Sequence, residues 1–233
     1  TIPLKTAITQ PYWLTEPYKN MFKVADIHLR GLPENPPVFD VTVKLSVYGM
    51  EMEYKIPVQY KWRDRVAGEN LQDFSIRPDL TVNLDNSVYV APTGQSKDIS
   101  VTVVAHKEKI TGKLALNLPE GWTASPASHI VTLNKKGAAT VFNFKVTAGV
   151  NASSGLFTVN CKNAEKTYDK SIVEIDYPHI HKQVLFPKAQ ATLVTGDLKV
   201  TRQNIAYVMG AGDNVPEAIE QLGAKVSILN PDN

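Results

Sequence analysis

Apolar and polar side chains alternate with a period of two residues over much of this chain. Residues 38–48 read Val-Phe-Asp-Val-Thr-Val-Lys-Leu-Ser-Val-Tyr, and the same alternation resumes over residues 52–60. In an extended chain, successive side chains point to opposite faces, so this period predicts two half-buried strands. The glycine between them predicts a hairpin that turns within residues 48–50.

Residues 1–78 are predicted to form a first β-sandwich of the immunoglobulin-like kind. Residues 22–29 supply a further candidate strand, and the three prolines of residues 31–37 predict a loop. Pro57 lacks a backbone donor, which favours an edge strand or a bulge at that position. A sheet with one apolar face must bury that face, and packing a second sheet on it is the simplest way to do so.

A second module is predicted over residues 79–178, because the pattern breaks at Pro78 and a new series of short strands follows. Seven strands with turns between them suit an immunoglobulin-like β-sandwich. The candidate strands are residues 80–84, 97–105, 110–118, 128–133, 140–146, 155–161 and 170–177. Cys161 is the single cysteine, so no intrachain disulfide joins the sheets and the thiol is expected to be a buried apolar residue.

The last segment, residues 198–233, changes to a mixed pattern that predicts one β-α-β unit. Residues 204–209 and 225–229 read as buried strands, and residues 216–222 read as a helix. Two parallel strands cannot bury both faces of a sheet, so this segment is expected to be the truncated start of a Rossmann-like α/β domain. The whole chain is therefore predicted to be mainly β, with two sandwiches in tandem before this unit.

The turn at residues 210–213, Gly-Ala-Gly-Asp, raises the alternative of a phosphate-binding loop. Helix N-termini attract anions. The turn lacks the third glycine of the dinucleotide motif, however, and Asp213 would repel a phosphate unless it caps the helix. No cofactor is predicted for this chain.

Charge and hydropathy exclude two classes of partner. The 25 basic and 23 acidic residues are interspersed, so there is no basic stripe of the kind that follows nucleic acid phosphates. No apolar run is long enough for a transmembrane helix. We therefore expect neither a nucleic acid partner nor a membrane span.

Four aromatic residues are the candidates for a binding site. Tyr12 and Trp13 lie near the start of the chain, and Tyr60 and Trp62 end the second strand of the predicted hairpin. Exposed rings of this type would form a platform on which sugar rings stack. The alternative is that these rings close the ends of a small sandwich core, because aromatic side chains bury large apolar areas.

Residues 179–197 are predicted to be a linker, which begins with a pair of histidines. His179 and His181 are two residues apart, so they would face the same way in an extended chain and could share a metal ion. Only Asp176 is near enough in sequence to add a third ligand. We therefore predict no metal site and no catalytic residue, and interpret the histidines as packing residues.

The second module resembles the immunoglobulin-like domain that accompanies carbohydrate-binding modules in bacterial α-galactosidases. The resemblance rests on Leu-Pro-Glu-Gly-Trp at residues 118–122, on residues 129–137 and on Phe-Asn-Phe-Lys-Val at residues 142–146. Proline stops the strand, glycine permits a tight turn, and Trp122 folds back to cap the core. Trp122 is accordingly expected to be structural.

The order of motifs along the whole chain resembles the middle and later region of large Bacteroidetes-type proteins of the PIG-L family. The motifs are residues 10–14, 31–35, 58–62 with 68–69, 118–122, 176–180 and 206–219. PIG-L enzymes are zinc hydrolases that remove N-acetyl groups from glucosamine-containing substrates, and their His-Pro-Asp-Asp motif does not occur here. The resemblance implies that this chain is not itself an enzyme but a non-catalytic accessory or spacer region of such a deacetylase.

In that setting, the partners are the neighbouring domains of the same polypeptide, upstream a deacetylase and downstream an α/β domain, together with a glycan. The accessory region would position the catalytic domain or assist substrate contact. The alternative is a carbohydrate-binding module that uses the exposed aromatic residues. A periplasmic or extracellular location is expected.

Overall fold

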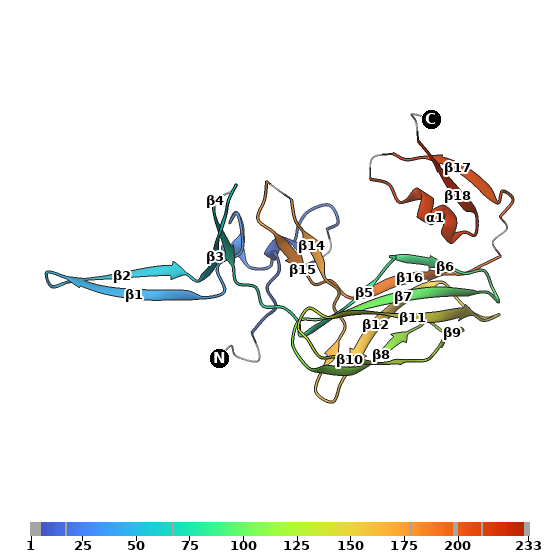
Figure 1. Cartoon of the computed structure of the whole chain (residues 1–233), viewed down its shortest axis with the longest axis horizontal. Coiled ribbons are helices and arrows are strands. Elements are labelled where there is room, and N and C mark those ends of the chain that lie inside the picture. The colour runs from blue at the N-terminus through green and yellow to red at the C-terminus, as the bar shows by residue number, and fades with distance from the viewer. Residues whose placement is uncertain are drawn as a thin grey trace. The chain divides into compact units, whose positions relative to one another are not determined.

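The computed structural model describes residues 6–16, 18–66, 68–177, 179–197, 200–210 and 212–230. Within them the chain is mainly β, with a single α-helix (Figure 1). The chain divides into two compact units, and each is described by itself. The first unit comprises Thr1–Pro78 with Ile172–Pro187, and the second comprises Asp79–Ser171 with Lys188–Asn233. Two predicted module boundaries, at residues 178 and 198, lie outside the described residues. Residue 211 of the predicted glycine-rich loop does so too.

The first unit contains paired strands and short turns of 3-10 helix. Its strands pair as β1 with β2, β3 with β4 and β14 with β15, all antiparallel. The elements are η1 (Tyr12–Leu14), η2 (Ile27–Leu29), β1 (Asp40–Val47), β2 (Met50–Pro57), β3 (Gln59–Asp64), β4 (Gly68–Asp73), β14 (Val173–Ile175) and β15 (Gln183–Leu185).

The predicted sandwich of residues 1–78 is wrong. Every described sheet of the first unit has only two strands, and nearly all side chains of β1 to β4 are exposed. The alternation correctly marks one apolar face on each side of a turn, but it cannot specify that a second sheet covers that face. Residues 22–29 form no strand: η2 occupies their end, where the Asp26 side chain accepts a hydrogen bond from the backbone N–H of His28 at 2.9 Å.

The predicted hairpin within residues 48–50 is confirmed. Tyr48 and Gly49 separate β1 from β2, and their φ angles are +51° and +82°. Two consecutive residues with positive φ match the mirror-image turn that suits the twist of an antiparallel pair. The register that follows pairs Asp40 with Pro57 and Val47 with Met50.

The second unit contains a β-sandwich of two sheets. One sheet has the order β5-β7-β11-β9, and the other has the order β10-β8-β12-β16-β6, with β13 paired to β12. The bounds are β5 (Leu80–Leu84), β6 (Val88–Val90), β7 (Ser96–Ala105), β8 (Ile110–Asn117), β9 (Trp122–Ser125), β10 (His129–Leu133), β11 (Ala139–Ala148), β12 (Gly155–Lys162), β13 (Thr167–Tyr168) and β16 (Gln190–Val194).

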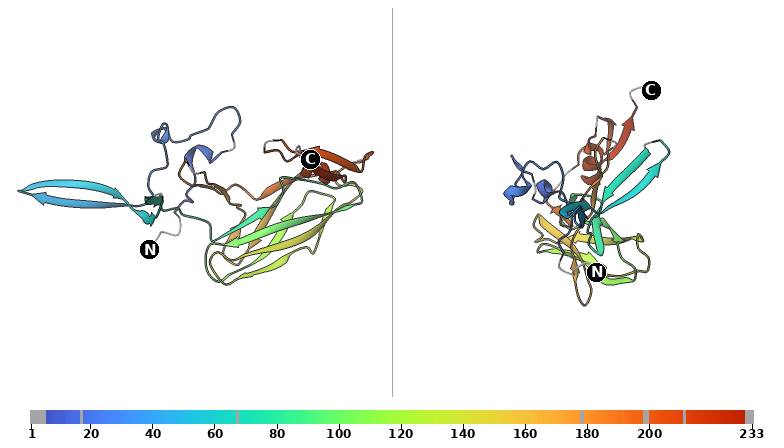
Figure 2. Two further views of the ribbon diagram at one scale, coloured as in Figure 1. Left: turned by 45° about the horizontal axis from the view of Figure 1, so that its top comes forward. Right: turned by 90° about the vertical axis from the view of Figure 1, so that its left-hand side faces the viewer.

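Both sheets contribute to one buried core. Val101 and Phe144 from the first sheet, and Phe157, Val159 and Leu193 from the second, have no exposed surface. Each large apolar side chain buried in this way contributes about 1.5–3 kcal/mol. The strands of both sheets, green to orange in Figures 1 and 2, gather in one body. This core stabilises the second unit, whereas the first unit has few buried residues among those described.

Six of the seven predicted sandwich strands are present, but the seventh and the linker are not as predicted. Residues 170–177 contribute only the short β14, which pairs with β15 in the first unit. Residues 179–197 are not simply a linker, because they contain β15 and β16. β16 completes the sandwich by pairing with β12 on one side and, in parallel, with β6 on the other.

The predicted β-α-β unit is present. β17 (Asn204–Val208) and β18 (Lys225–Leu229) are parallel and in register from end to end. The helix α1 (Val215–Gln221) joins them, with Pro216 in its first turn. Gly223, at φ +100°, follows the helix and takes a conformation that other residues rarely adopt.

Candidate functional site

The hairpin of β3 and β4 carries the best-defined candidate site. Its turn closes locally, because the Asp64 carboxylate accepts a hydrogen bond from the Val66 backbone N–H at 2.7 Å. Gly68 follows at φ +78°, a value that favours glycine. The register then pairs Tyr60 with Gln72 and Trp62 with Asn70.

Tyr60 and Trp62 are stacked on one face of this hairpin. Their ring centroids are 5.6 Å apart and their planes differ by 23°. Tyr60 is 61% exposed and Trp62 is 40% exposed, so the pair faces solvent. Directly opposed residues of antiparallel strands share a face, which places the amides of Asn70 and Gln72 beside the rings. We call these four residues the aromatic face.

The opposite face of the same hairpin is charged and internally paired. Lys61 and Glu69 form an ion pair at 2.6 Å, and the Gln59 amide donates to the Asp73 carboxylate at 2.8 Å. Exposed pairs of this kind contribute less than about 1 kcal/mol each. They nevertheless favour the observed register, which keeps the aromatic residues together on the other side.

Tyr12 and Trp13 form a separate pair, which holds the chain together rather than presenting a platform. Their rings meet edge to face at 4.8 Å, and both side chains are partly buried. The Tyr12 hydroxyl donates to the Leu32 carbonyl at 2.7 Å. Asn35 accepts from the Tyr12 backbone N–H at 2.9 Å and donates to the Gln10 carbonyl at 2.7 Å. These bonds join η1 to the loop of residues 32–35.

An open hollow of about 620 Å³ lies beside Tyr12. Met21, Phe22 and Arg30 contribute to its lining, and both apolar side chains are more than half exposed. The Arg30 guanidinium donates to the Val24 carbonyl at 3.1 Å, so its charge is directed at the backbone of the same loop. Glu16 and Lys23 also line the hollow and pair with each other at 3.5 Å, so the charged groups of its lining are engaged within the chain.

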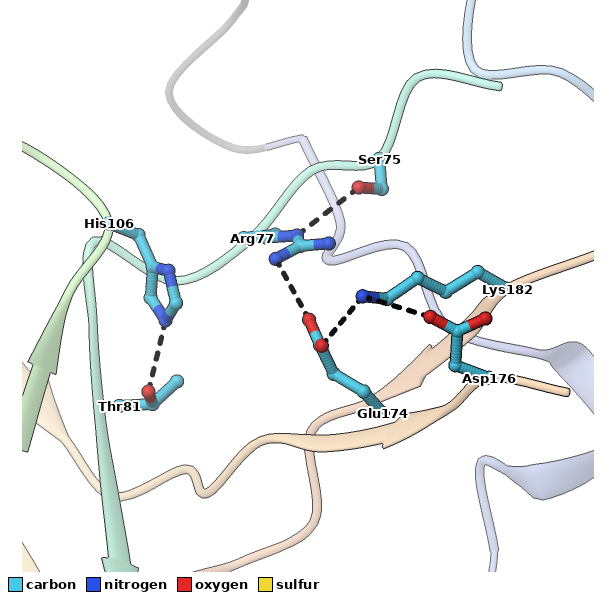
Figure 3. A network of polar contacts seen from close by, with 7 residues as sticks. All are labelled: Ser75, Arg77, Thr81, His106, Glu174, Asp176 and Lys182. Carbon is cyan, nitrogen blue, oxygen red and sulfur yellow. Dashed lines mark hydrogen bonds and ion pairs between the residues drawn. The ribbon is translucent and has the colours of Figure 1, made fainter. Parts of the chain in front are cut away.

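An ion network joins β14 and β15 to the end of the N-terminal segment of the first unit (Figure 3). Glu174 contacts Lys182 at 2.7 Å and Arg77 at 3.5 Å, and Lys182 also contacts Asp176 at 3.6 Å. The hydrogen bond from Lys182 lowers the pKa of Glu174, and the same bond raises the pKa of Lys182. Arg77 further donates to the Ser75 hydroxyl at 3.4 Å. This network has a structural role, because its carboxylates are held by cations.

The histidines have separate contacts. His181 contacts the Glu34 carboxylate at 2.8 Å, while the His179 ring lies 5.9 Å from the Tyr177 ring. In the second unit, His106 hydrogen-bonds the Thr81 hydroxyl at 3.0 Å, as Figure 3 also shows, and His129 packs against Phe144. Among the described residues, no group of three or more His, Cys, Asp or Glu side chains is arranged to hold a metal ion.

The turn after β17 is closed by its own carboxylate. Asp213 accepts hydrogen bonds from the Gly210 backbone N–H at 3.0 Å and from the Tyr207 hydroxyl at 3.1 Å. Its second oxygen accepts a longer bond, 3.4 Å, from the Val215 backbone N–H at the start of α1. A carboxylate in this position repels a phosphate, so the phosphate-loop alternative finds no support in the geometry.

Trp122 and Cys161 are parts of the sandwich core, as the sequence predicts. Trp122 is 6% exposed, and its indole N–H donates to the Ser153 carbonyl at 2.8 Å. Cys161 has no exposed surface, and this burial raises the pKa of its thiol to about 11. Neither side chain can reach a ligand in solution.

The sequence predictions named two members of the aromatic face and missed the other two. Asn70 and Gln72 lie in Gly-Glu-Asn-Leu-Gln-Asp, a stretch with one apolar residue and no alternation that would indicate a strand. Asn70 and Gln72 are two residues apart, as Tyr60 and Trp62 are, and the two pairs lie on either side of the same turn. This spacing is the only sequence signal that could have indicated that the amides lie opposite the rings.

No family model and no curated protein matches the chain. None of the helices in the described part of the chain has the length and apolar character of a membrane span.

Proposed function

We propose that this chain is a non-catalytic accessory region of a multidomain glycan-processing hydrolase of the PIG-L type, and that it assists contact with the glycan substrate. The observation that carries the substrate contact is the aromatic face, where exposed, stacked Tyr60 and Trp62 lie beside Asn70 and Gln72. The order of sequence motifs supports the assignment to a deacetylase parent.

The chemistry of the aromatic face suits a sugar ring. One face of a pyranose presents C–H groups that pack on an aromatic ring, while its hydroxyls need hydrogen-bond partners. Tyrosine and tryptophan combine an apolar ring with a polar group. The Gln72 amide offers both donors and an acceptor. The Asn70 amide donates to the Gly68 carbonyl at 3.2 Å and retains its oxygen and a second N–H, so both side chains can bond hydroxyl groups at the edge of a stacked sugar.

The two-sheet sandwich is proposed to be an immunoglobulin-like spacer. Its single buried core gives it the rigidity that a spacer needs. In this proposal the β-α-β segment is the start of a Rossmann-like domain, and a zinc-dependent deacetylase domain precedes the chain. The parent protein acts in the periplasm or outside the cell, where polymeric amino sugars are found.

Titration with chito-oligosaccharides, both acetylated and deacetylated, tests glycan contact. The chain has three tryptophans, and Trp122 is buried, so a change in fluorescence on binding reports on Trp13 or Trp62. A Trp13→Phe variant leaves Trp62 as the exposed reporter. We expect its emission to shift with the sugar, and calorimetry to show affinity reduced at least tenfold by Trp62→Ala.

The matched control is Tyr18→Ala, which removes a ring of the first unit that is 60% exposed, against 61% for Tyr60. Binding should survive this change and weaken in Tyr60→Ala. No response in the Trp13→Phe variant at millimolar sugar would refute glycan contact through this face. The accessory role is tested separately: robust deacetylation by this chain with added zinc would overturn it.

A further inference from the structure

The hairpin of β1 and β2 has one entirely apolar face. Its register sets Val41 opposite Ile56 and Leu45 opposite Met52, and the pairs between and beyond them are also apolar. Because directly opposed residues share a face, all eight side chains lie on the same side. This apolar face consists of Val41, Val43, Leu45, Val47, Met50, Met52, Tyr54 and Ile56.

The reverse face of this hairpin is polar. Lys44 and Glu53 are opposed and form an ion pair at 3.8 Å, and Lys55 lies opposite Thr42. Two lysines and three acidic residues, Asp40, Glu51 and Glu53, leave no excess of positive charge. A hairpin that binds anionic lipid or nucleic acid would need such an excess. The charge distribution therefore favours a protein partner.

The apolar face is uncovered. Seven of its eight side chains are between 37% and 66% exposed, and Val43 is partly buried. Neither β1 nor β2 pairs with another described strand, so each also has an open edge. The largest exposed apolar patch of a protein is often an interaction site, which makes this face a candidate interface.

The area of the face indicates what can cover it. Burying an aliphatic side chain removes on the order of 100 Å² from water, and an aromatic ring removes more than about 150 Å². Because about half of each side chain is exposed, the face presents on the order of 500 Å². Two such faces remove on the order of 1,000 Å², just below the roughly 1,200 Å² of the smallest stable interfaces.

We propose that the apolar face packs against the same face of a second copy of this chain. The face is complementary to itself, because it carries no charge that a partner would have to neutralise, and the Tyr54 hydroxyl already donates to the Met52 sulfur at 3.6 Å within the face. A two-fold arrangement buries the same patch on both copies and closes without forming a fibre. The small area predicts a weak, reversible dimer that forms as the concentration rises.

Sedimentation velocity of the full chain over a range from about 1 to 300 μM tests the proposal. We expect the average mass to rise from monomer to dimer with concentration. Leu45→Glu buries an unpaired carboxylate in the interface, so it should weaken association at least tenfold. Leu45→Thr, which introduces a β-branched residue suited to a strand, should weaken association less and in the same direction.

Thr42→Glu is the control, because it adds the same charge to the same strand on the polar face, opposite Lys55. It should leave the dissociation constant within about threefold of the parent. A chain that stays monomeric to 300 μM overturns the proposal, as does a dimer that both Leu45 variants leave unchanged. Monomeric chain that instead co-sediments with vesicles of phosphatidylcholine and phosphatidylglycerol would assign the face to lipid and also refute it.

Discussion

Replacing Gly121 with alanine should cost the sandwich far more stability than the same change at Gly137. Both glycines have nearly the same φ, +82° and +83°, a conformation that a side chain disfavours by about 1–2 kcal/mol. The two glycines differ in the atoms that surround them. A Cβ at Gly121 would lie 2.6 Å from the Cα of Ala152 and 2.7 Å from its nitrogen, whereas a Cβ at Gly137 would meet nothing within 4 Å.

The extra cost at Gly121 follows from what the new methyl group meets. Ala152 presents backbone atoms, which cannot rotate away as the end of a long side chain can. The Gly121 carbonyl also accepts a hydrogen bond from the Gly149 backbone N–H at 2.9 Å, which fixes the two loops together. Forcing a methyl group into such a contact costs about 1–3 kcal/mol. We therefore expect a loss of about 2–5 kcal/mol for Gly121→Ala and about 1–2 kcal/mol for Gly137→Ala.

Equilibrium unfolding in urea measures both losses. The emission of Trp122, which follows Gly121 and is buried, reports on the sandwich, and a background of Trp13→Phe and Trp62→Phe removes the other two tryptophans. The two variants should share the slope of the parent, so that midpoint shifts can be compared directly. If the losses agree within about 0.5 kcal/mol, the contact with Ala152 does not limit this turn and the reasoning fails.

Three further changes test the packing and the ion network. Gly112→Ala places a methyl group 2.6 Å from the Cys161 sulfur, so it should lower the free energy of unfolding in urea by about 1–3 kcal/mol. The same change should cost less in a Cys161→Ala background. Additive losses from the two substitutions would contradict this contact. The Cys161 thiol, whose pKa burial raises to about 11, should not react with a disulfide reagent at pH 8 until urea unfolds the sandwich; immediate reaction in the native state would show the core to be open. Lys182 holds the pKa of Glu174 below its ordinary value of 4.5. The pair therefore stabilises the first unit fully above pH 4.5, and this stabilisation is lost as the pH falls through the lower pKa that Glu174 has in the folded state. Glu174→Gln should therefore lower stability at pH 7, by at most about 1 kcal/mol because the pair is partly exposed, with the difference closing below pH 4.5; a difference that persists in acid would rule out the ion pair as its cause.

The strands with the clearest alternation are the part of the fold that the sequence predicts well. Residues 97–105 and 140–146 became β7 and β11, because each buries every second side chain between the two sheets. β6 was missed because three residues are too few for a periodic signal, whereas β16 is as long as the correctly predicted β5 and was missed for another reason. The buried side chains of β16 are Ala191 and Leu193, and the small alanine leaves only one large apolar residue to mark the buried side.

The first unit shows the limit of the same argument. Alternation over residues 38–60 predicts the turn at Tyr48 and Gly49 and the apolar side of β1 and β2, and both are present. The expectation that Tyr60 and Trp62 end the second strand is wrong, because that strand stops at Pro57 and both residues belong to β3. The sandwich was an additional assumption, that an apolar face is always covered within the chain. In β1 and β2 it is not covered by any described strand, so the pattern that predicted a core instead marks a surface.

The candidate site also depends both on the local spacing of residues and on their tertiary contacts. Tyr12 and Tyr60 have similar sequence surroundings, since each lies within two residues of a tryptophan. Both were therefore candidates for sugar stacking. What separates them is the hydrogen bond from the Tyr12 hydroxyl to the Leu32 carbonyl, a contact between residues 20 apart in sequence. Tyr60 and Trp62, two apart on a strand, must share a face whatever lies around them. The local spacing therefore predicts the stacked pair, but only the tertiary contacts decide which aromatic pair faces solvent.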